Sequence, residues 1–240
     1  MGRKSVVLVF TLIAMAGFSA RASGFSVRGE ESLASELQRI KNAIEIIEEM
    51  VAIPEEGIPE ALLSKAYGIA IIPKVIKAAW VVGGRYGKGV LLVRNEKGRW
   101  GDPCFIRIAG GSVGWQIGVQ SADIILVFKR RKSIESITEG KITLGADAGL
   151  AAGPIGRHAE ASTDIGFNAE IYSYSKSKGL FAGISIEGSA IQIDEKANAT
   201  FYDSDTVTAR DILFGGKKLE VPVIAQKLIR VLTEYTTTQL

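Results

Sequence analysis

The chain has 240 residues, of which 47% are hydrophobic and 23% charged, with a formal net charge of +3. This composition predicts one compact domain and excludes a disordered or collagen-like chain, because the 27 glycines follow no period and stand among large apolar residues. The single cysteine, Cys104, excludes an internal disulfide, and with only one histidine, His158, a zinc site is hard to build.

The first 22 residues have the layout of a secretory signal peptide. Arg3 and Lys4 precede an uncharged apolar run over residues 6–18, and a small-x-small triplet ends at Ala22. The run is shorter than the ~20 residues of a membrane span, although an uncleaved anchor is the alternative. We therefore expect a secreted or periplasmic protein that is cleaved by the Sec pathway after Ala22.

Cleavage would change the charge balance. The removed segment contains three of the 29 basic residues and no acid, which leaves 26 basic and 26 acidic residues. A neutral mature chain gives no indication of nucleic-acid binding. The expected organisation is a signal peptide over residues 1–22, an N-terminal amphipathic helix and linker over 23–58, and the main domain over 59–240.

The next segment predicts a long amphipathic helix that begins at Glu30 and ends at Val51. Its apolar residues recur every three or four positions, at Leu33, Leu37, Ile40, Ile44, Ile47 and Met50. The polar face, which includes Glu36 and Arg39, is mostly acidic, whereas a helix that binds anionic lipid is basic. This helix is therefore expected to pack on a protein partner or on its own domain.

A short helix is predicted over residues 58–68, and from there the hydrophobic period shortens to two. β-like runs then continue to residue 194, interrupted by a helical pattern over 132–140, with hairpin turns predicted at 87–89 and 95–98. Sequential strands joined by tight turns predict an α+β fold with a curled, largely antiparallel, glycine-rich β-sheet or barrel-like core.

Helical patterns return near the C-terminus. Two short ones cover residues 194–202 and 208–215, and an amphipathic one covers 221–236 and is expected to pack on the sheet. Asp203 and Asp205 are interpreted as turn residues and as a cap for the helix after residue 208.

Catalytic chemistry has little support in the sequence. The stretch GGRYGKG lacks phosphate-loop spacing, because Lys88 is followed by Gly89 and the stretch joins two strands. His158, in GPIGRHAEAS, is the sole basis for a hydrolytic enzyme, and no G-x-S-x-G elbow is present. Cys104 lies in an apolar run and is interpreted as buried. We expect no catalytic residue, metal or cofactor.

Basic clusters are the remaining candidates for a binding site. Four consecutive cations, at 129–132, follow a predicted strand, and Lys176 and Lys178 flank a predicted turn. Cations near an anionic membrane each add to binding, although such clusters also occur as solvated corners.

Four blocks of the sequence resemble, in order, the SYLF domain, a lipid-binding module of yeast actin-patch proteins, of animal and plant phosphoinositide-binding proteins, and of secreted bacterial proteins. Two blocks are the most specific, ITLGADAGLAAGPIGRHAEA at 142–161 and YSYSKSKGLFAGISIEGS at 172–189. KAYGIAIIPKVIKAAWVVGGRYGKGVLLVR at 65–94 and FYDSDTVTARDILFGG at 201–216 support them. The resemblance covers residues 62–215.

The resemblance implies a non-enzymatic protein that binds phosphoinositides or other anionic lipids and, in some eukaryotic relatives, actin filaments. A basic helix precedes the domain in relatives that bind phosphoinositides, whereas the helix here is acidic. We interpret the chain as a secreted, bacterial-type member whose expected contacts with phospholipid head groups are Lys129, Arg130, Arg131, Lys132, Lys176, Lys178 and, more weakly, Arg157. The alternative is an envelope protein-interaction module that uses the acidic helix.

Overall fold

A computed structural model of the chain describes residues 19–51, 57–79, 82–113, 118–154, 169–177, 180–181, 186–215 and 219–236. The helices are α1 (Ser19–Val51), α2 (Glu60–Ser64), α3 (Arg131–Thr138), α5 (Glu195–Phe201), α6 (Ala209–Phe214) and α7 (Val223–Thr236). The strands are β1 (Gly68–Ala79), β2 (Val82–Val93), β3 (Cys104–Val113), β4 (Gly118–Phe128), β5 (Lys141–Thr143), β6 (Leu150–Ala152), β7 (Ile171–Ser177), β8 (Leu180–Phe181) and β9 (Ser189–Ile193).

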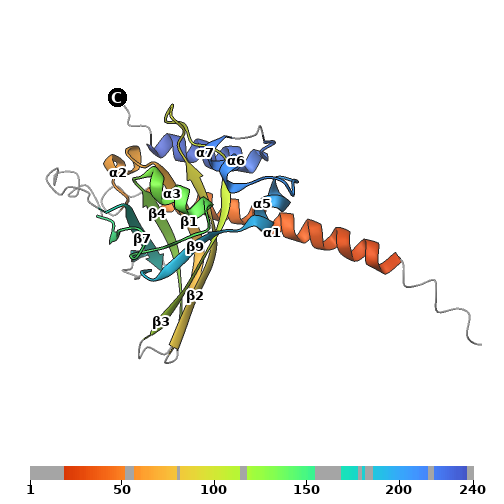
Figure 1. The fold of residues 1–240 in the computed structure, drawn as a ribbon, viewed down its shortest axis with the longest axis horizontal. Coiled ribbons are helices and arrows are strands. Elements are labelled where there is room, and N and C mark those ends of the chain that lie inside the picture. Colours follow the sequence, from red (N-terminus) through yellow and green to blue (C-terminus); the bar gives the residue numbers. More distant parts are fainter. Residues whose placement is uncertain are drawn as a thin grey trace, which may run out of the picture.

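The strands form one curled sheet, in the order β5-β9-β3-β2-β1-β4-β7-β6, with β8 paired to β7. Neighbouring strands are antiparallel except for β6 and β7, which are parallel. The α+β fold with a largely antiparallel, curled sheet is therefore confirmed. Strands β1 to β4 are the long ones, and the lower halves of β2 and β3 extend well beyond the helices in Figure 1.

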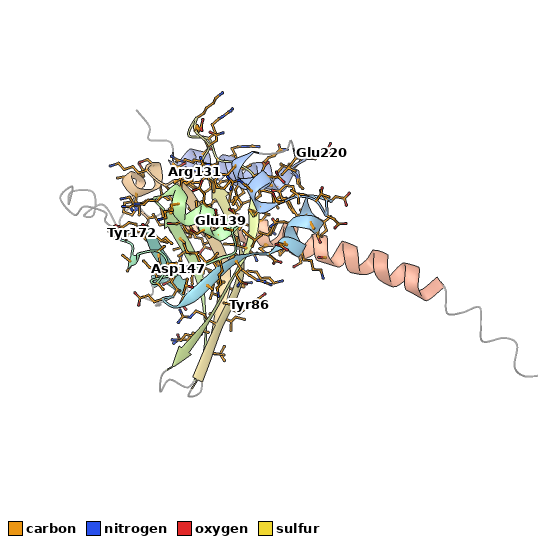
Figure 2. The ribbon with its side chains drawn as sticks, in the orientation of Figure 1. Tyr86, Arg131, Glu139, Asp147, Tyr172 and Glu220 are labelled. Carbon is orange, nitrogen blue, oxygen red and sulfur yellow. The ribbon has the colours of Figure 1, made fainter. Side chains whose placement is uncertain are left out.

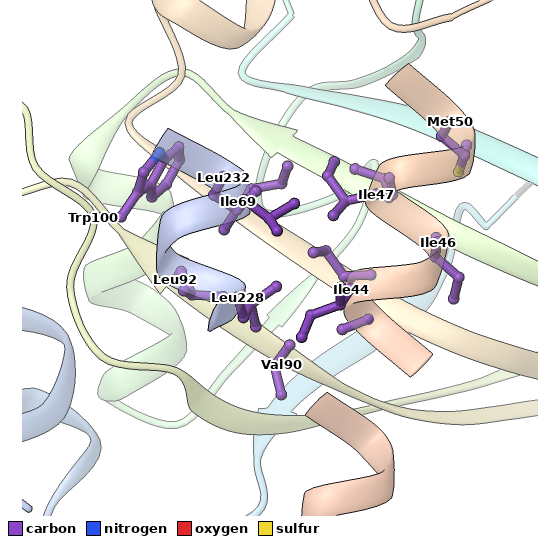
Figure 3. Packing of buried hydrophobic residues seen from close by; sticks show 14 of the residues in the cluster. Ile44, Ile46, Ile47, Met50, Ile69, Val90, Leu92, Trp100, Leu228 and Leu232 are labelled. Atoms are coloured by element: carbon purple, nitrogen blue, oxygen red, sulfur yellow. The ribbon is translucent and has the colours of Figure 1, made fainter. Parts of the chain in front are cut away.

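Two apolar layers hold the sheet between helices. On one face, α1 and α7 bury Ile44, Ile47 and Leu228 against Val90 and other strand residues (Figure 3). On the other face, α3 and α6 bury Ile134, Ile137, Ile212 and Leu213 against the strands. The apolar stripe predicted for residues 30–51 is thus the surface by which α1 packs on its own domain. The expected packing of the C-terminal helix on the sheet is also confirmed.

A buried ionic cluster fixes α1 to the domain. Glu36 and Arg39, assigned to the polar face from the sequence, are only 4% and 6% exposed. Arg39 contacts the Glu36 carboxylate at 2.7 Å and the Asp194 carboxylate at 3.3 Å, and its guanidinium lies over the Phe105 ring. The sequence places both residues on the polar face of the helix, yet the structure buries them, because Asp194, directly after β9, supplies a partner that local sequence does not reveal.

The hairpin turn predicted at residues 87–89 was also wrong, since these residues lie inside β2. A Cβ atom on Gly89 would overlap the Ile71 carbonyl oxygen and lie 2.8 Å from the Ile72 Cα, so glycine lets β1 approach closely at a bulge. The turn predicted at residues 95–98 is confirmed, because Gly98 donates a backbone hydrogen bond to the Asn95 carbonyl oxygen.

Helix α6 begins at a cap different from the predicted one. The Thr208 hydroxyl accepts from the Asp211 amide, and the Asp211 carboxylate accepts from the Thr208 amide, which forms a capping box. Asp203 lies in a turn with a φ of 47°. Thr208, and not Asp203 or Asp205, therefore caps this helix.

The expected signal segment falls mostly outside the described residues. Residues 19–22 form the first turn of α1, whereas residues 1–18 are not described. None of the helices in the described part of the chain is long and apolar enough to cross a bilayer.

Candidate anion-binding groove

The predicted basic cluster lies where β4 ends and α3 begins. The chain stays extended at Arg130, with φ −123° and ψ 138°, and Arg131 is the first residue of α3. Lys129, on the strand side of the turn, donates its amide to the Glu170 carbonyl oxygen, which ties the cluster to the start of β7. Arg130, Arg131 and Lys132 are exposed.

Two of these cations contact carboxylates of the same chain. Arg130 Nη1 lies 3.0 Å from Glu170 Oε1, and Arg131 Nε lies 2.7 Å from Glu135 Oε1. The other Glu170 oxygen accepts a hydrogen bond from the Ser133 hydroxyl at 3.1 Å. Because both arginine side chains are largely exposed, these pairs are weak and can be exchanged for a phosphate.

Arg131 also borders a groove of about 500 Å³. Three further cations line it, Arg94, Lys97 and Arg99, from the segment that follows β2. The carboxylates in its lining are Glu96 and Asp102. Sequence reasoning missed the cations at 94, 97 and 99, although they flank the predicted turn at 95–98, because only the pairing of β1 with β2 and β4 brings the ends of β2 and β4 together.

Arg94 is the anchored cation of the groove. Its guanidinium donates to the carbonyl oxygens of Ser64, Leu63 and Thr236, at 2.6, 3.4 and 3.2 Å, and lies 4.7 Å from the Trp100 ring centroid. These carbonyls belong to the C-terminal ends of α2 and α7, where the helix dipole favours a cation. Burial lowers the Arg94 pKa. Arg94 therefore links α2 and α7 to the sheet and also contributes a positive charge to the groove.

The apolar wall of the groove comes from α6. The Phe214 ring lies 4.9 Å below the Arg131 guanidinium and 5.9 Å from that of Arg210. Tyr67 also lines the groove, where burial raises its pKa and the nearby Arg131 acts in the opposite direction. A site that combines several cations with an aromatic ring suits a phosphate carried on a partly apolar group.

Lys65 adds to this basic surface. Burial lowers the Lys129 pKa, and the positive charges of Lys65 and Arg130 lower it further, so these three cations lie close together. Lys65 follows directly on α2 and was not selected from the sequence. The surface therefore contains more cations than the run at 129–132.

The second predicted cluster lies elsewhere. In the β4–β7 register, Phe128 faces Ile171 and Asp123 faces Lys176, which places Lys176 about 17 Å along the strand from the groove. Lys176 Nζ contacts the Glu49 carboxylate of α1 at 3.1 Å, with its own side chain 12% exposed. Lys178, Arg157 and His158 lie outside the described residues, so their expected roles remain predictions.

No histidine or cysteine is among the described residues that line the groove. Cys104 is fully buried, and burial raises its pKa to about 12, which keeps the thiol protonated. Among the described residues, no group of three or more histidine, cysteine, aspartate or glutamate side chains could hold a metal ion. The chemistry that this arrangement supports is the binding of an anion.

Residues 109–235 match the family model described as Ysc84, Las17-binding protein actin regulator. The chain is 36% identical to the SH3 domain-containing YSC84-like protein 1 of Xenopus laevis over 202 residues, which are 82% of this chain and 59% of that protein. It is 41% identical to Protein YSC84 of Saccharomyces cerevisiae over 181 residues, which are 74% of this chain and 38% of that protein.

The chain thus spans between about two fifths and three fifths of the length of these relatives. The human SH3 domain-containing YSC84-like protein 1 gives the same picture, with 36% identity over 82% of this chain and 58% of its own length. The family match covers more than half of the chain and includes β4, β7, β9 and the three C-terminal helices. The chain therefore belongs to the Ysc84 family, the SYLF-domain family that its sequence resembles.

Proposed function

We propose that this domain binds the phosphate-bearing head groups of anionic phospholipids in the groove between α3, α6 and the 94–102 segment. The observation that carries the proposal is that Arg94, Lys97, Arg99 and Arg131 line one groove together with Phe214, whose ring lies against the Arg131 guanidinium. A phosphate would replace the half-buried carboxylate partner of Arg131, Glu135, and the glycerol part of a lipid would lie against the ring.

The secreted location expected from the N-terminal segment is part of this proposal. In that setting the anionic lipids that the groove would meet are phosphatidylglycerol and cardiolipin. Lys65, Lys129, Arg130 and Lys132 extend the basic surface beyond the groove and would contact neighbouring head groups. The contacts expected for Lys176, Lys178 and Arg157 are not needed for this site.

Vesicle sedimentation tests the proposal. The chain is mixed with phosphatidylcholine vesicles that contain phosphatidylglycerol or cardiolipin, at low and at high salt. We expect binding at low salt that weakens as salt rises, because screening reduces the attraction between exposed charges and the bilayer. The Lys97→Gln, Arg131→Gln variant is expected to lose affinity by about tenfold or more.

Two exposed cations on α7, Lys227 and Arg230, provide the matched control. Lys227→Gln, Arg230→Gln removes the same charge but does not touch the lining of the groove. Equal loss of binding in the two double variants, or no binding to anionic vesicles at any salt concentration, would contradict a groove-specific site. Titration with a soluble head group, glycerophosphoglycerol, separates binding in the groove from general attraction to a charged bilayer.

A protein partner is the second candidate function, favoured by the family description as Las17-binding actin regulators. The apolar face of α1 is covered by its own domain, so a partner would meet the outer face, where Glu45 and Glu49 are exposed. Co-sedimentation with actin filaments tests this candidate. Pelleting that is lost in Glu45→Lys, Glu49→Lys but kept in the groove variant would favour it over lipid binding.

A further inference from the structure

We infer that the end of the sheet opposite the groove is a second lipid-contacting surface, which docks on the interface of an anionic bilayer. We call this the far end: residues 74–79 of β1, 82–89 of β2, 107–113 of β3 and 118–123 of β4. Figure 2 shows Tyr86 at this end and Arg131 at the other. The inference extends the proposed function, on which it rests only in requiring an anionic lipid.

The far end is strongly cationic for its size. Its charged residues are one carboxylate, Asp123, and five cations, which are Lys74, Lys77, Arg85, Lys88 and Arg107. The strand registers place Lys77 directly opposite Arg85 and Lys88 directly opposite Arg107. Like charges at facing positions of an antiparallel pair reduce stability, and of the two pairs Lys88–Arg107 is the exposed one, because Arg85 is only 7% exposed. The Lys88–Arg107 pair therefore marks a surface that an external anion would stabilise.

The compensation of these cations within the chain is incomplete. Lys88 Nζ lies 3.9 Å from the Asp194 carboxylate, which also serves Arg39, and Lys88 is 48% exposed. The Arg107 guanidinium donates to the Gln192 side-chain oxygen, and Arg85 donates to the Ser189 hydroxyl, both of which are uncharged acceptors. An anionic surface is therefore the complementary partner.

Apolar side chains project from the same end. Ile76 is 52% exposed and faces Tyr86, which is 48% exposed. Val119 is 75% exposed and faces Ala78 on the other side of β1. Tyr86 and Lys88 share the face of β2 that carries Val90, which is the face that α1 covers closer to the groove.

Apolar and basic residues follow one another along the strands. Val119 lies closest to the end of the sheet, Ile76 and Tyr86 follow, and the Lys88–Arg107 pair lies about 7 Å behind Tyr86. Aromatic and aliphatic residues in front of cations match the order of acyl chains and head groups in a bilayer interface.

The charge pattern also selects a bilayer over a second copy of the chain. Two far ends placed face to face would bring cation pairs against cation pairs, which opposes association. The far end and the groove lie roughly 35 Å apart along β1, so a bilayer that meets the domain end-on at the far end does not reach the groove. A domain docked by its far end therefore leaves the groove open to another lipid source.

A fluorophore on the far end tests the inference. Cys104 is fully buried with a raised pKa, so a maleimide dye would label an introduced cysteine selectively. Val119→Cys places an environment-sensitive nitrobenzoxadiazole dye on the far end. Val223→Cys, on α7, is the matched control, because the two valines are 75% and 78% exposed.

With phosphatidylglycerol vesicles, we expect the emission of the dye at 119 to shift to the blue and increase at least twofold, while the dye at 223 stays unchanged. An unchanged dye at 119 on protein that pellets with the vesicles would overturn the inference. A blue shift at 119 that grows with protein concentration without vesicles would also overturn it, because it would identify a second copy as the occupant.

Variants separate this inference from the proposed function. Tyr86→Ser, Lys88→Gln is expected to lower vesicle partitioning about tenfold while affinity for glycerophosphoglycerol in the groove is unchanged. Lys97→Gln, Arg131→Gln is expected to lower head-group affinity while the dye at 119 still responds. If the first variant binds vesicles like the wild type, the far end is not a docking surface, whatever the groove binds.

Discussion

At the groove end of the sheet, cations contact carbonyl or carboxylate oxygens of their own chain, whereas at the far end Arg85 and Arg107 contact uncharged side chains and stand opposite other cations. Arg94 is held by three carbonyl oxygens, and Arg130 and Arg131 each contact a carboxylate. At the far end Lys88 stands opposite Arg107. The two ends therefore differ in how far the fold compensates their charges, a difference that a count of basic residues does not reveal.

The two ends also differ in packing. Helices cover both faces of the sheet near the groove, where a Cβ atom on Gly68 would overlap the Ile134 side chain and lie 3.1 Å from the Leu92 carbonyl oxygen. At the far end, a Cβ atom on Gly111 would have no atom within 4 Å. The groove end is therefore packed on both faces, whereas the outer part of the far end around Gly111 has open space.

The largest effect is expected where the fold compensates charge most completely. Arg39→Met would leave the Glu36 and Asp194 carboxylates buried without their main partner and lower the free energy of unfolding by about 3 kcal/mol. Lys41→Met, at an exposed position of the same helix, should change it by less than about 0.5 kcal/mol. Urea denaturation measures both, and similar values would show that α1 is not held by this cluster.

A glycine pair tests the difference in packing. Gly68→Ala is expected to cost about 1 to 3 kcal/mol, because the new methyl group must displace Ile134 or the Leu92 backbone. Gly111→Ala meets open space and should leave the free energy of unfolding unchanged or slightly higher. Thermal unfolding of the two variants ranks the costs, and an equal loss at both positions would remove the contrast between the ends.

The smallest effect concerns the pH dependence of Glu36. Burial raises its pKa above the usual 4.5, against the opposing attraction of Arg39, so the folded state binds this proton more tightly than the unfolded state does. The contribution of Glu36 to stability must therefore fall as pH rises from about 4.5 through the raised pKa.

Glu36→Gln removes this titration while the amide can still accept from Arg39. The difference in unfolding free energy, variant minus wild type, should become more positive across that pH window, by less than the cost of Gly68→Ala. Urea denaturation at several pH values measures it. A difference that does not vary with pH would show that the Glu36 pKa is not raised.

Local patterns were sufficient for much of the fold. The three- to four-residue period from Leu33 to Met50 predicted the buried stripe of α1, and the turn at 95–98 followed from its residue types. The turn predicted from the glycines at 87 and 89 was wrong, because these glycines allow Ile71 and Ile72 of the neighbouring strand to approach closely. The T-x-x-D pattern of Thr208 and Asp211 is a capping-box signature in the sequence, and the structure uses it in place of Asp203 and Asp205.

The candidate site was only partly predictable. The consecutive cations at 129–132 are visible in the sequence, and the structure keeps them together at one turn. Arg94, Lys97 and Arg99 join Arg131 only because β1 pairs with both β2 and β4, a long-range contact that no local pattern contains. The β4–β7 register places Lys176 away from the groove, where it contacts Glu49 of α1.

Clustering of phosphatidylglycerol vesicles, followed by dynamic light scattering, tests the central claim that both ends of this domain contact anionic lipid. The account predicts that the wild-type chain clusters vesicles at low salt. It predicts that Lys97→Gln, Arg131→Gln and Tyr86→Ser, Lys88→Gln each abolish clustering while the Lys227→Gln, Arg230→Gln control retains it. Clustering that persists in both of the first two variants, or an absence of clustering by wild-type chain that is bound to the vesicles, would contradict it.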